Sequence, residues 1–159
     1  MKSYGLGEET ERRYPFELSG GMSRRILISA AVMEEPDLVI ADEPTPGLHL
    51  KAAKRVLSHF REIADRGAGV LLITHDLPLA LEVADRIVVF YAGTTVEEAA
   101  VLDFKDEDSL RHSYTKALYR AMPEHGFKGT PGRQPFAAEL PEGCVYGPRC
   151  PWFSENCKR

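Results

Sequence analysis

The chain has 159 residues, of which 43% are hydrophobic and 28% are charged, and its formal net charge is −4. The length predicts about one domain, and this ordinary composition excludes a wholly disordered chain, a collagen-like chain and a coiled-coil rod. Because no apolar run approaches the roughly 18 residues of a membrane helix, no secretion signal opens the chain, and no face is obviously basic, we expect a cytosolic protein without a nucleic-acid partner.

Residues 1–93 alternate between helical and strand patterns. Ser19 is placed to cap a helix over 20–35, which Pro36 would end. Residues 37–41 predict a fully buried strand, because apolar residues follow one another there without alternation. The next predicted elements are a helix at 50–66, a strand at 70–74, a helix at 77–84 capped by Asp76, and a strand at 87–91. This order is typical of an α/β fold in which helices cover a parallel sheet.

The remainder of the chain is more polar and less regular. Residues 94–125 predict one short strand at 96–101 and a helix at about 114–121. Residues 126–159 are rich in proline and glycine, contain all three cysteines, and predict little regular structure. An odd number of clustered cysteines does not suit a disulfide framework, and in a cytosolic protein it indicates metal or cluster ligands.

Two of the predicted strands end in reactive side chains. Asp42 and Glu43 follow the first strand, and His75 and Asp76 follow the second. Ligands bind beyond the carboxyl ends of parallel strands, where one carboxylate can hold magnesium and the next can deprotonate a water. A nearby imidazole can contact a terminal phosphate. Turn and cap residues are the alternative, and spacing alone leaves both interpretations open.

A glycine pair opens the first predicted helix. The run Leu18–Ser19–Gly20–Gly21–Met22 lets a phosphate approach the backbone at a helix N-terminus, where free amides favour an anion. Taken alone, this run is better explained as a plain helix cap.

Together and in this order, these segments resemble the ATP-binding subunits of ABC transporters. LSGGM resembles the signature motif, LVIADEPT resembles the Walker B segment with its catalytic glutamate, and ITHD resembles the switch-histidine loop. The resemblance covers essentially the whole chain and implies a RecA-like P-loop NTPase nucleotide-binding domain that hydrolyses ATP with Mg²⁺. It assigns Asp42 to magnesium, Glu43 to the general base and His75 to the γ-phosphate.

The same resemblance implies the partners. Ser19, Gly20 and Gly21 would contact the ATP held by a second ATPase subunit, identical or different, that faces the first head to tail. The helical subdomain would dock on a membrane permease, which a solute-binding protein serves. The subunit would then lie at the cytoplasmic face of the cell membrane.

The C-terminal segment narrows the resemblance further. PEGCVYGPRCPWFSENC resembles the cysteine-rich tail of ATPases that serve oligopeptide, dipeptide and nickel importers. Cys144, Cys150 and Cys157 match the first three cysteines of that tail, where some members ligate an iron–sulfur cluster. Because a cubane cluster generally needs four thiolates, zinc or no metal stay open as alternatives. The transported solute, peptide or nickel, is not decided by the sequence.

Two departures from the family pattern stand out. The phosphate loop G-x-x-x-x-G-K-[ST] is absent, so the chain resembles the C-terminal half of a subunit, with part of the helical subdomain in front. We expect such a chain to be inactive alone. His49 takes the place of an aspartate that is common at the end of the D-loop; either it makes one composite ATP site unlike the other, or it is a tolerated variant at an exposed helix start.

Two rival functions are weighed against the importer. One is an ABC-type ATPase of DNA repair or chromosome structure, which usually carries coiled-coil insertions that this sequence lacks. The other is a non-enzymatic fragment that serves only as an interaction module. The remaining polar residues are given structural roles: Lys51, Lys54 and Arg55 as a solvated helix face, and His59, His112 and His125 as histidines without paired ligand spacing.

Overall fold

The computed structural model describes residues 6–34 and 36–158. The chain divides into two units, Met1–Val83 and Ala84–Arg159, each of which is described by itself. The division lies before the strand that was predicted to close the segment 1–93, because that strand pairs with the residues that follow it. No helix in the described part of the chain is both long enough and apolar enough to span a membrane.

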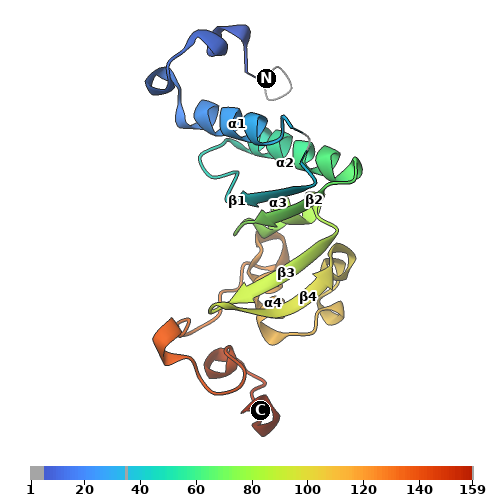
Figure 1. Ribbon diagram of the computed structural model, residues 1–159. Helices are drawn as coiled ribbons and strands as arrows, with labels where there is room; N and C mark the ends of the chain where they lie inside the picture. Colours follow the sequence, from blue (N-terminus) through green and yellow to red (C-terminus); the bar gives the residue numbers. More distant parts are fainter. Residues whose placement is uncertain (1–5, 35, 159) are drawn as a thin grey trace. The chain divides into compact units, whose positions relative to one another are not determined.

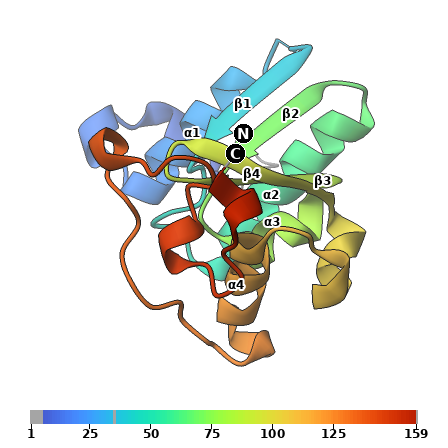
Figure 2. The ribbon, with the colours of Figure 1, turned by 90° about the horizontal axis from the view of Figure 1, so that it is seen from below.

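The first unit is built on a parallel pair of strands with helices on one face (Figure 1). Strand β1 pairs in parallel with β2, with Asp42 opposite Ile73, and Figure 2 shows the two strands side by side. The elements of this unit are α1 (Gly20–Ala31), β1 (Leu38–Asp42), α2 (Leu50–Asp65), β2 (Gly69–Ile73) and α3 (Leu77–Val83).

The core of this unit lies between the sheet and α2. Val39 and Ala41 of β1 are buried against a cluster that includes Val56 and Leu57 of α2. The intervening residues of β1 are open: Leu38 is 58% exposed and Ile40 is 62% exposed. The prediction of a fully buried strand is therefore wrong, because helices cover only one face of the pair in the described residues.

The predicted helix caps are confirmed. The Ser19 hydroxyl accepts a hydrogen bond from the amide of Met22 at 3.3 Å, and the Asp76 carboxylate accepts one from the amide of Leu79 at 3.1 Å. Helix α1 ends at Ala31, earlier than predicted, because residues 32–34 form a turn ahead of Pro36. Residue 35, the predicted last helical residue, lies outside the described part of the chain.

The second unit is an antiparallel hairpin followed by a helix and a tail. Its elements are β3 (Arg86–Tyr91), β4 (Thr94–Ala100) and α4 (Ser113–Ala121). Ala92 and Gly93 join the strands with φ of 47° and 82°, as a type I′ turn requires. Such a short turn returns the chain antiparallel, so β3 and β4 form a hairpin. That the third strand also extends the parallel sheet stays a prediction.

The tail is irregular, as predicted, yet it is fixed in place. Its described residues, 126–158, contain neither α-helix nor strand. Tyr146 is 1% exposed and packs edge-on against Tyr91, with ring centroids 5.3 Å apart. Arg149 donates hydrogen bonds to the Tyr91 hydroxyl and to two tail carbonyls. Short 3₁₀ turns complete the fold at Glu8–Arg12, Pro15–Glu17, Val101–Lys105, Glu107–Ser109, Pro123–His125, Ala137–Glu139, Gly147–Arg149 and Glu155–Lys158.

Candidate functional site

The carboxyl ends of β1 and β2 bring a carboxylate and an imidazole together. Because the strands are parallel and Asp42 lies opposite Ile73, the residues that follow each strand leave the sheet at the same edge. Oε1 of Glu43 lies 2.8 Å from Nδ1 of His75. The side chain of Glu43 is 38% exposed and that of His75 is 78% exposed, so the pair is open to a ligand from solvent.

The backbone at Glu43 is held in an unfavourable conformation. Its φ of 45° lies in the left-handed region, which costs a residue with a side chain about 1–3 kcal/mol. Its amide donates to the carbonyl of Ile73 at 2.9 Å, which fixes the turn. The second carboxylate oxygen, Oε2, is buried and has no hydrogen-bond partner among the described residues. Strain and an unpaired polar atom coincide at one residue, which is typical of a functional site.

The pairing changes the acidity of the imidazole. The hydrogen bond with Glu43, together with the negative charge of that carboxylate, raises the pKa of His75 above its ordinary value, and desolvation opposes the rise. Asp76 adds a smaller charge effect in the same direction as Glu43. The protonated imidazolium is therefore favoured at this edge of the sheet.

Arg24 holds the loop that follows Glu43. From helix α1, its Nη1 atom donates to the carbonyl oxygen of Glu43 at 2.9 Å and to that of Pro46 at 2.8 Å. Sequence reasoning assigned no role to Arg24. An arginine near the start of the glycine-rich helix is a permanent positive charge, and this was the one hint in the sequence. The sequence does not show which distant carbonyl groups lie opposite that arginine.

The glycine-rich helix start lies next to the same loop. A Cβ on Gly21 would come within 3.2 Å of the Leu48 side chain, whereas a Cβ on Gly20 would meet open space. No hydrogen bond between described residues joins Ser19, Gly20 or Gly21 to Glu43 or His75. The structure thus presents two separate groups of the predicted site residues.

Asp42 and His49 occupy the two ends of this loop region. Asp42 is exposed at the end of β1, and its carboxylate supplies the hard oxygen ligand that magnesium prefers. His49 caps helix α2, because its Nδ1 atom accepts a hydrogen bond from the amide of Ala52 at 3.3 Å. The cap gives His49 a structural role at an exposed helix start.

A cavity of about 290 Å³ lies between this loop and His75, lined by residues that include Thr45, Gly47, Leu50, Asp76 and Leu79.

The structure does not bring the three cysteines together with other ligands in its described residues. Sγ of Cys144 lies 3.5 Å from Nε2 of His112, a pairing that the sequence did not reveal, and Sγ of Cys157 lies 3.6 Å from the Ser154 hydroxyl. In the described residues, no group of three or more histidine, cysteine or acidic side chains could hold a metal ion. The assignment of Cys144, Cys150 and Cys157 as cluster ligands stays a prediction.

Comparison with protein families finds two matches. Residues 96–157 match the model of the oligopeptide/dipeptide transporter C-terminal region, and residues 1–46 match the ABC transporter model. The dipeptide transport ATP-binding protein of Haemophilus influenzae is 40% identical over 167 residues, covering 100% of this chain and 50% of that protein. The oligopeptide transport ATP-binding protein of Mycobacterium tuberculosis is 40% identical over 158 residues, covering 94% of this chain and 25% of that protein. The chain thus spans half or less of these curated relatives.

Solved structures show the same relationship. A dimeric ATP-binding cassette in a post-hydrolysis state, bound to ADP and phosphate, aligns with a TM-score of 0.59 and 28% identity over 63% of this chain and 43% of that chain. An ATP-binding subunit of an ABC transporter aligns with a TM-score of 0.57 and 33% identity over 70% of this chain and 48% of that chain. The predicted α/β fold of a P-loop NTPase is confirmed over the aligned part.

Proposed function

Because the chain belongs to the ATP-binding subunits of the oligopeptide/dipeptide ABC transporter family, we propose that it carries the catalytic base and the phosphate-sensing histidine of an ATP site that energises peptide import. The contact of 2.8 Å between Glu43 and His75, at the carboxyl ends of β1 and β2, is the observation that carries this proposal. Plain turn residues would explain neither the left-handed backbone of Glu43 nor its unpaired buried oxygen.

The chemistry follows from the protons of the pair. Glu43 orients the attacking water and accepts its proton. Nδ1 of His75 faces the carboxylate, so only the imidazolium has a second N–H, at Nε2, to donate to a phosphate oxygen. The raised pKa of His75 favours that form. Asp42 would hold Mg²⁺, which would supply positive charge beside the phosphates of the substrate ATP.

The glycine-rich start of α1 serves a different ATP molecule. Ser19, Gly20 and Gly21 contact the nucleotide held by a facing ATPase subunit, through amides at the positive end of the helix. The open space beside Gly20 leaves room for a phosphate to approach the backbone, and the aligned dimeric cassette supports a paired arrangement. His49, at the end of the D-loop, lies in the region that would meet the partner.

The partners are proposed from the family. They are a second ATPase subunit, identical or different, a membrane permease and, indirectly, a solute-binding protein, with the subunit peripheral at the cytoplasmic face. The names of the relatives favour peptides over nickel as the solute. The match over residues 96–157 favours a transporter over a DNA-repair ATPase. An interaction module without turnover of its own is the second candidate.

ATP hydrolysis separates these two candidates. The chain is measured alone and then joined to the N-terminal half of a family member that supplies the phosphate loop. We expect no turnover from the chain alone, turnover from the joined protein, and a loss of about 10²–10⁴-fold on Glu43→Gln, the usual contribution of a positioned base. Glu98→Gln removes a surface carboxylate that pairs with Arg86 and is the matched control. Wild-type turnover by the joined Glu43→Gln protein would contradict the proposal.

A further inference from the structure

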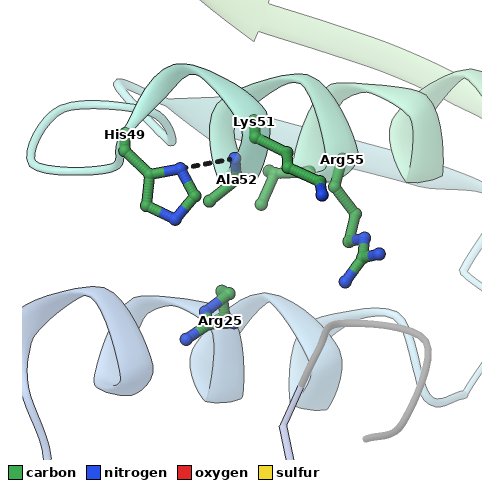
Figure 3. A pocket seen from close by; sticks show the side chains of 6 residues that line it. Arg25, His49, Lys51, Ala52 and Arg55 are labelled. Atoms are coloured by element: carbon green, nitrogen blue, oxygen red, sulfur yellow. Dashed lines mark hydrogen bonds between the residues drawn. The ribbon is translucent and has the colours of Figure 1, made fainter.

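A second cavity lies between helices α1 and α2 of the first unit (Figure 3). Its volume is about 230 Å³, and its lining residues do not overlap with those of the cavity beside His75. Arg25 from α1, His49 at the N-cap of α2, and Lys51 and Arg55 from α2 supply basic side chains, and no acidic residue among those described lines the cavity. The cavity is therefore a concentration of positive charge in a chain whose net charge is −4.

The charges around this cavity repel one another. Lys51 and Arg55 lie four residues apart on α2, where like charges destabilise a helix. In the described residues no carboxylate pairs with Lys51 or Arg55, whereas the neighbouring Lys54 pairs with Glu82 at 2.7 Å. Helix α2 also has no acidic residue in its first turn, where the helix dipole would favour one. A bound anion would offset the repulsion between Lys51 and Arg55 and would supply the negative charge that the start of α2 lacks.

The side chains are arranged so that their donors can meet one ligand. Nδ1 of His49 accepts the amide hydrogen of Ala52, so the neutral ring carries its proton on Nε2. Figure 3 shows that nitrogen facing the space between the helices, with Arg55 reaching from α2 in the same direction. Arg25 lies on α1 at the other side of this space, where its Nε atom donates to the carbonyl of Gly21 at 3.1 Å. Donors from two helices therefore line the same space.

We propose that this cavity binds a small soluble phosphate, such as inorganic phosphate or diphosphate. The planar fork of an arginine matches two phosphate oxygens, and the ammonium of Lys51 adds a point charge. The volume corresponds to about eight waters at roughly 30 Å³ each, and it is smaller than the roughly 300–1,000 Å³ of sites for larger organic ligands. This site shares no residue with the Glu43–His75 pair, and its binding of phosphate does not depend on the proposed ATP site.

Titration calorimetry with inorganic pyrophosphate, at constant ionic strength, tests the proposal on the 159-residue chain. We expect binding at one site, weakened about tenfold or more by Lys51→Gln and by Arg55→Gln, because each removes a charge-assisted hydrogen bond. Lys54→Gln is the matched control: it removes the same charge from the same helix but outside the cavity, and it should leave the affinity within about twofold.

Thermal unfolding supplies a second measurement. Pyrophosphate should raise the melting temperature of the wild-type chain and of Lys54→Gln, but not that of Lys51→Gln, because only a ligand bound to the folded state stabilises it. If Arg55→Gln fails to fold, Lys51→Gln alone decides, since Lys51 is exposed in the first turn of α2. No binding by the wild-type chain, or equal weakening by all three substitutions, would overturn the proposal.

Discussion

The two units of the chain differ in how their central polar group is held. In the first unit, Glu43 has a left-handed backbone and one buried oxygen without a described partner. In the second unit, the guanidinium of Arg149 donates to the hydroxyl of Tyr91 at 3.1 Å and to the carbonyls of Thr130 and Pro131 at 3.1 and 2.9 Å. The first arrangement stores strain, whereas the second satisfies its donors.

This difference distinguishes a ligand-binding site from a structural anchor. Strain and unpaired groups persist where the surrounding structure holds them for a ligand, as we propose for Glu43. A satisfied network instead holds one conformation, and Arg149 anchors a tail that has no regular structure of its own. Substitutions in both units test this difference between a strained and a satisfied polar group.

Truncating the core of each unit should have the largest effect. Tyr146→Ala removes a ring that is 1% exposed, and it should lower the free energy of unfolding by about 3–5 kcal/mol, as for other large aromatic residues. Leu57→Ala removes a side chain that is 2% exposed in the first unit and should cost about 2–5 kcal/mol. Amide hydrogen exchange in β3 and β1, respectively, reports each loss. Unchanged protection of β3 in Tyr146→Ala would show that the tail is not part of the second unit's core.

Removing the anchor that Arg149 provides for the tail should have an intermediate effect on stability. Arg149→Ala leaves the partly buried acceptors around it unpaired and should cost about 1–3 kcal/mol. Arg149→Lys keeps the charge but loses the planar fork, so it should behave more like alanine than like the wild type. Limited proteolysis of residues 126–158 is the measurement, and Arg133→Ala, at an exposed arginine of the same tail, is the control. Equal cleavage of residues 126–158 in Arg149→Ala and Arg133→Ala would show that Arg149 does not anchor the tail.

Relieving backbone strain should have a smaller effect of opposite sign. Glu43 and Ala92 both have positive φ, 45° and 47°, one in each unit. Replacing either by glycine should raise the free energy of unfolding by roughly 1 kcal/mol, because the left-handed penalty disappears. In the joined protein, Glu43→Gly should also lose ATP turnover, whereas Ala92→Gly should keep it. Chemical denaturation measures both; destabilisation by Glu43→Gly alone would mean that its conformation is not strained.

The sequence predicts the local features well, because neighbouring residues determine them. The caps by Ser19 and Asp76 follow from short polar side chains before apolar helices, and the parallel arrangement of β1 and β2 places Glu43 and His75 at one edge. The antiparallel pairing of β3 with β4 was not predicted, although both strands were expected and a short turn at Ala92 and Gly93 joins them.

Features that depend on distant partners could not be predicted. The open face of β1, with Ile40 exposed, depends on which segments cover the sheet. The contacts of Arg24 and the basic cavity around Arg25 arise because two helices lie together, and a helical pattern does not show which residue of another helix faces it. The pairing of Cys144 with His112 is likewise a tertiary contact.

The pH dependence of the Glu43–His75 pair has a defined sign. Because folding raises the pKa of His75, its pairing stabilises the folded chain fully below the ordinary histidine pKa. This contribution is lost as the pH rises through the higher pKa of the folded state. The effect on stability should be small, since the imidazole is largely exposed.

The pKa of His75, measured by NMR titration in the wild-type chain and in Glu43→Gln, tests most directly whether these residues form one working pair. Our account predicts a pKa above the ordinary histidine value in the wild type and a fall toward that value in Glu43→Gln. His112, in the second unit, has a pKa that burial lowers, and it is an internal reference that should not change. An identical pKa of His75 in both proteins would contradict the pairing on which the proposed ATP site rests.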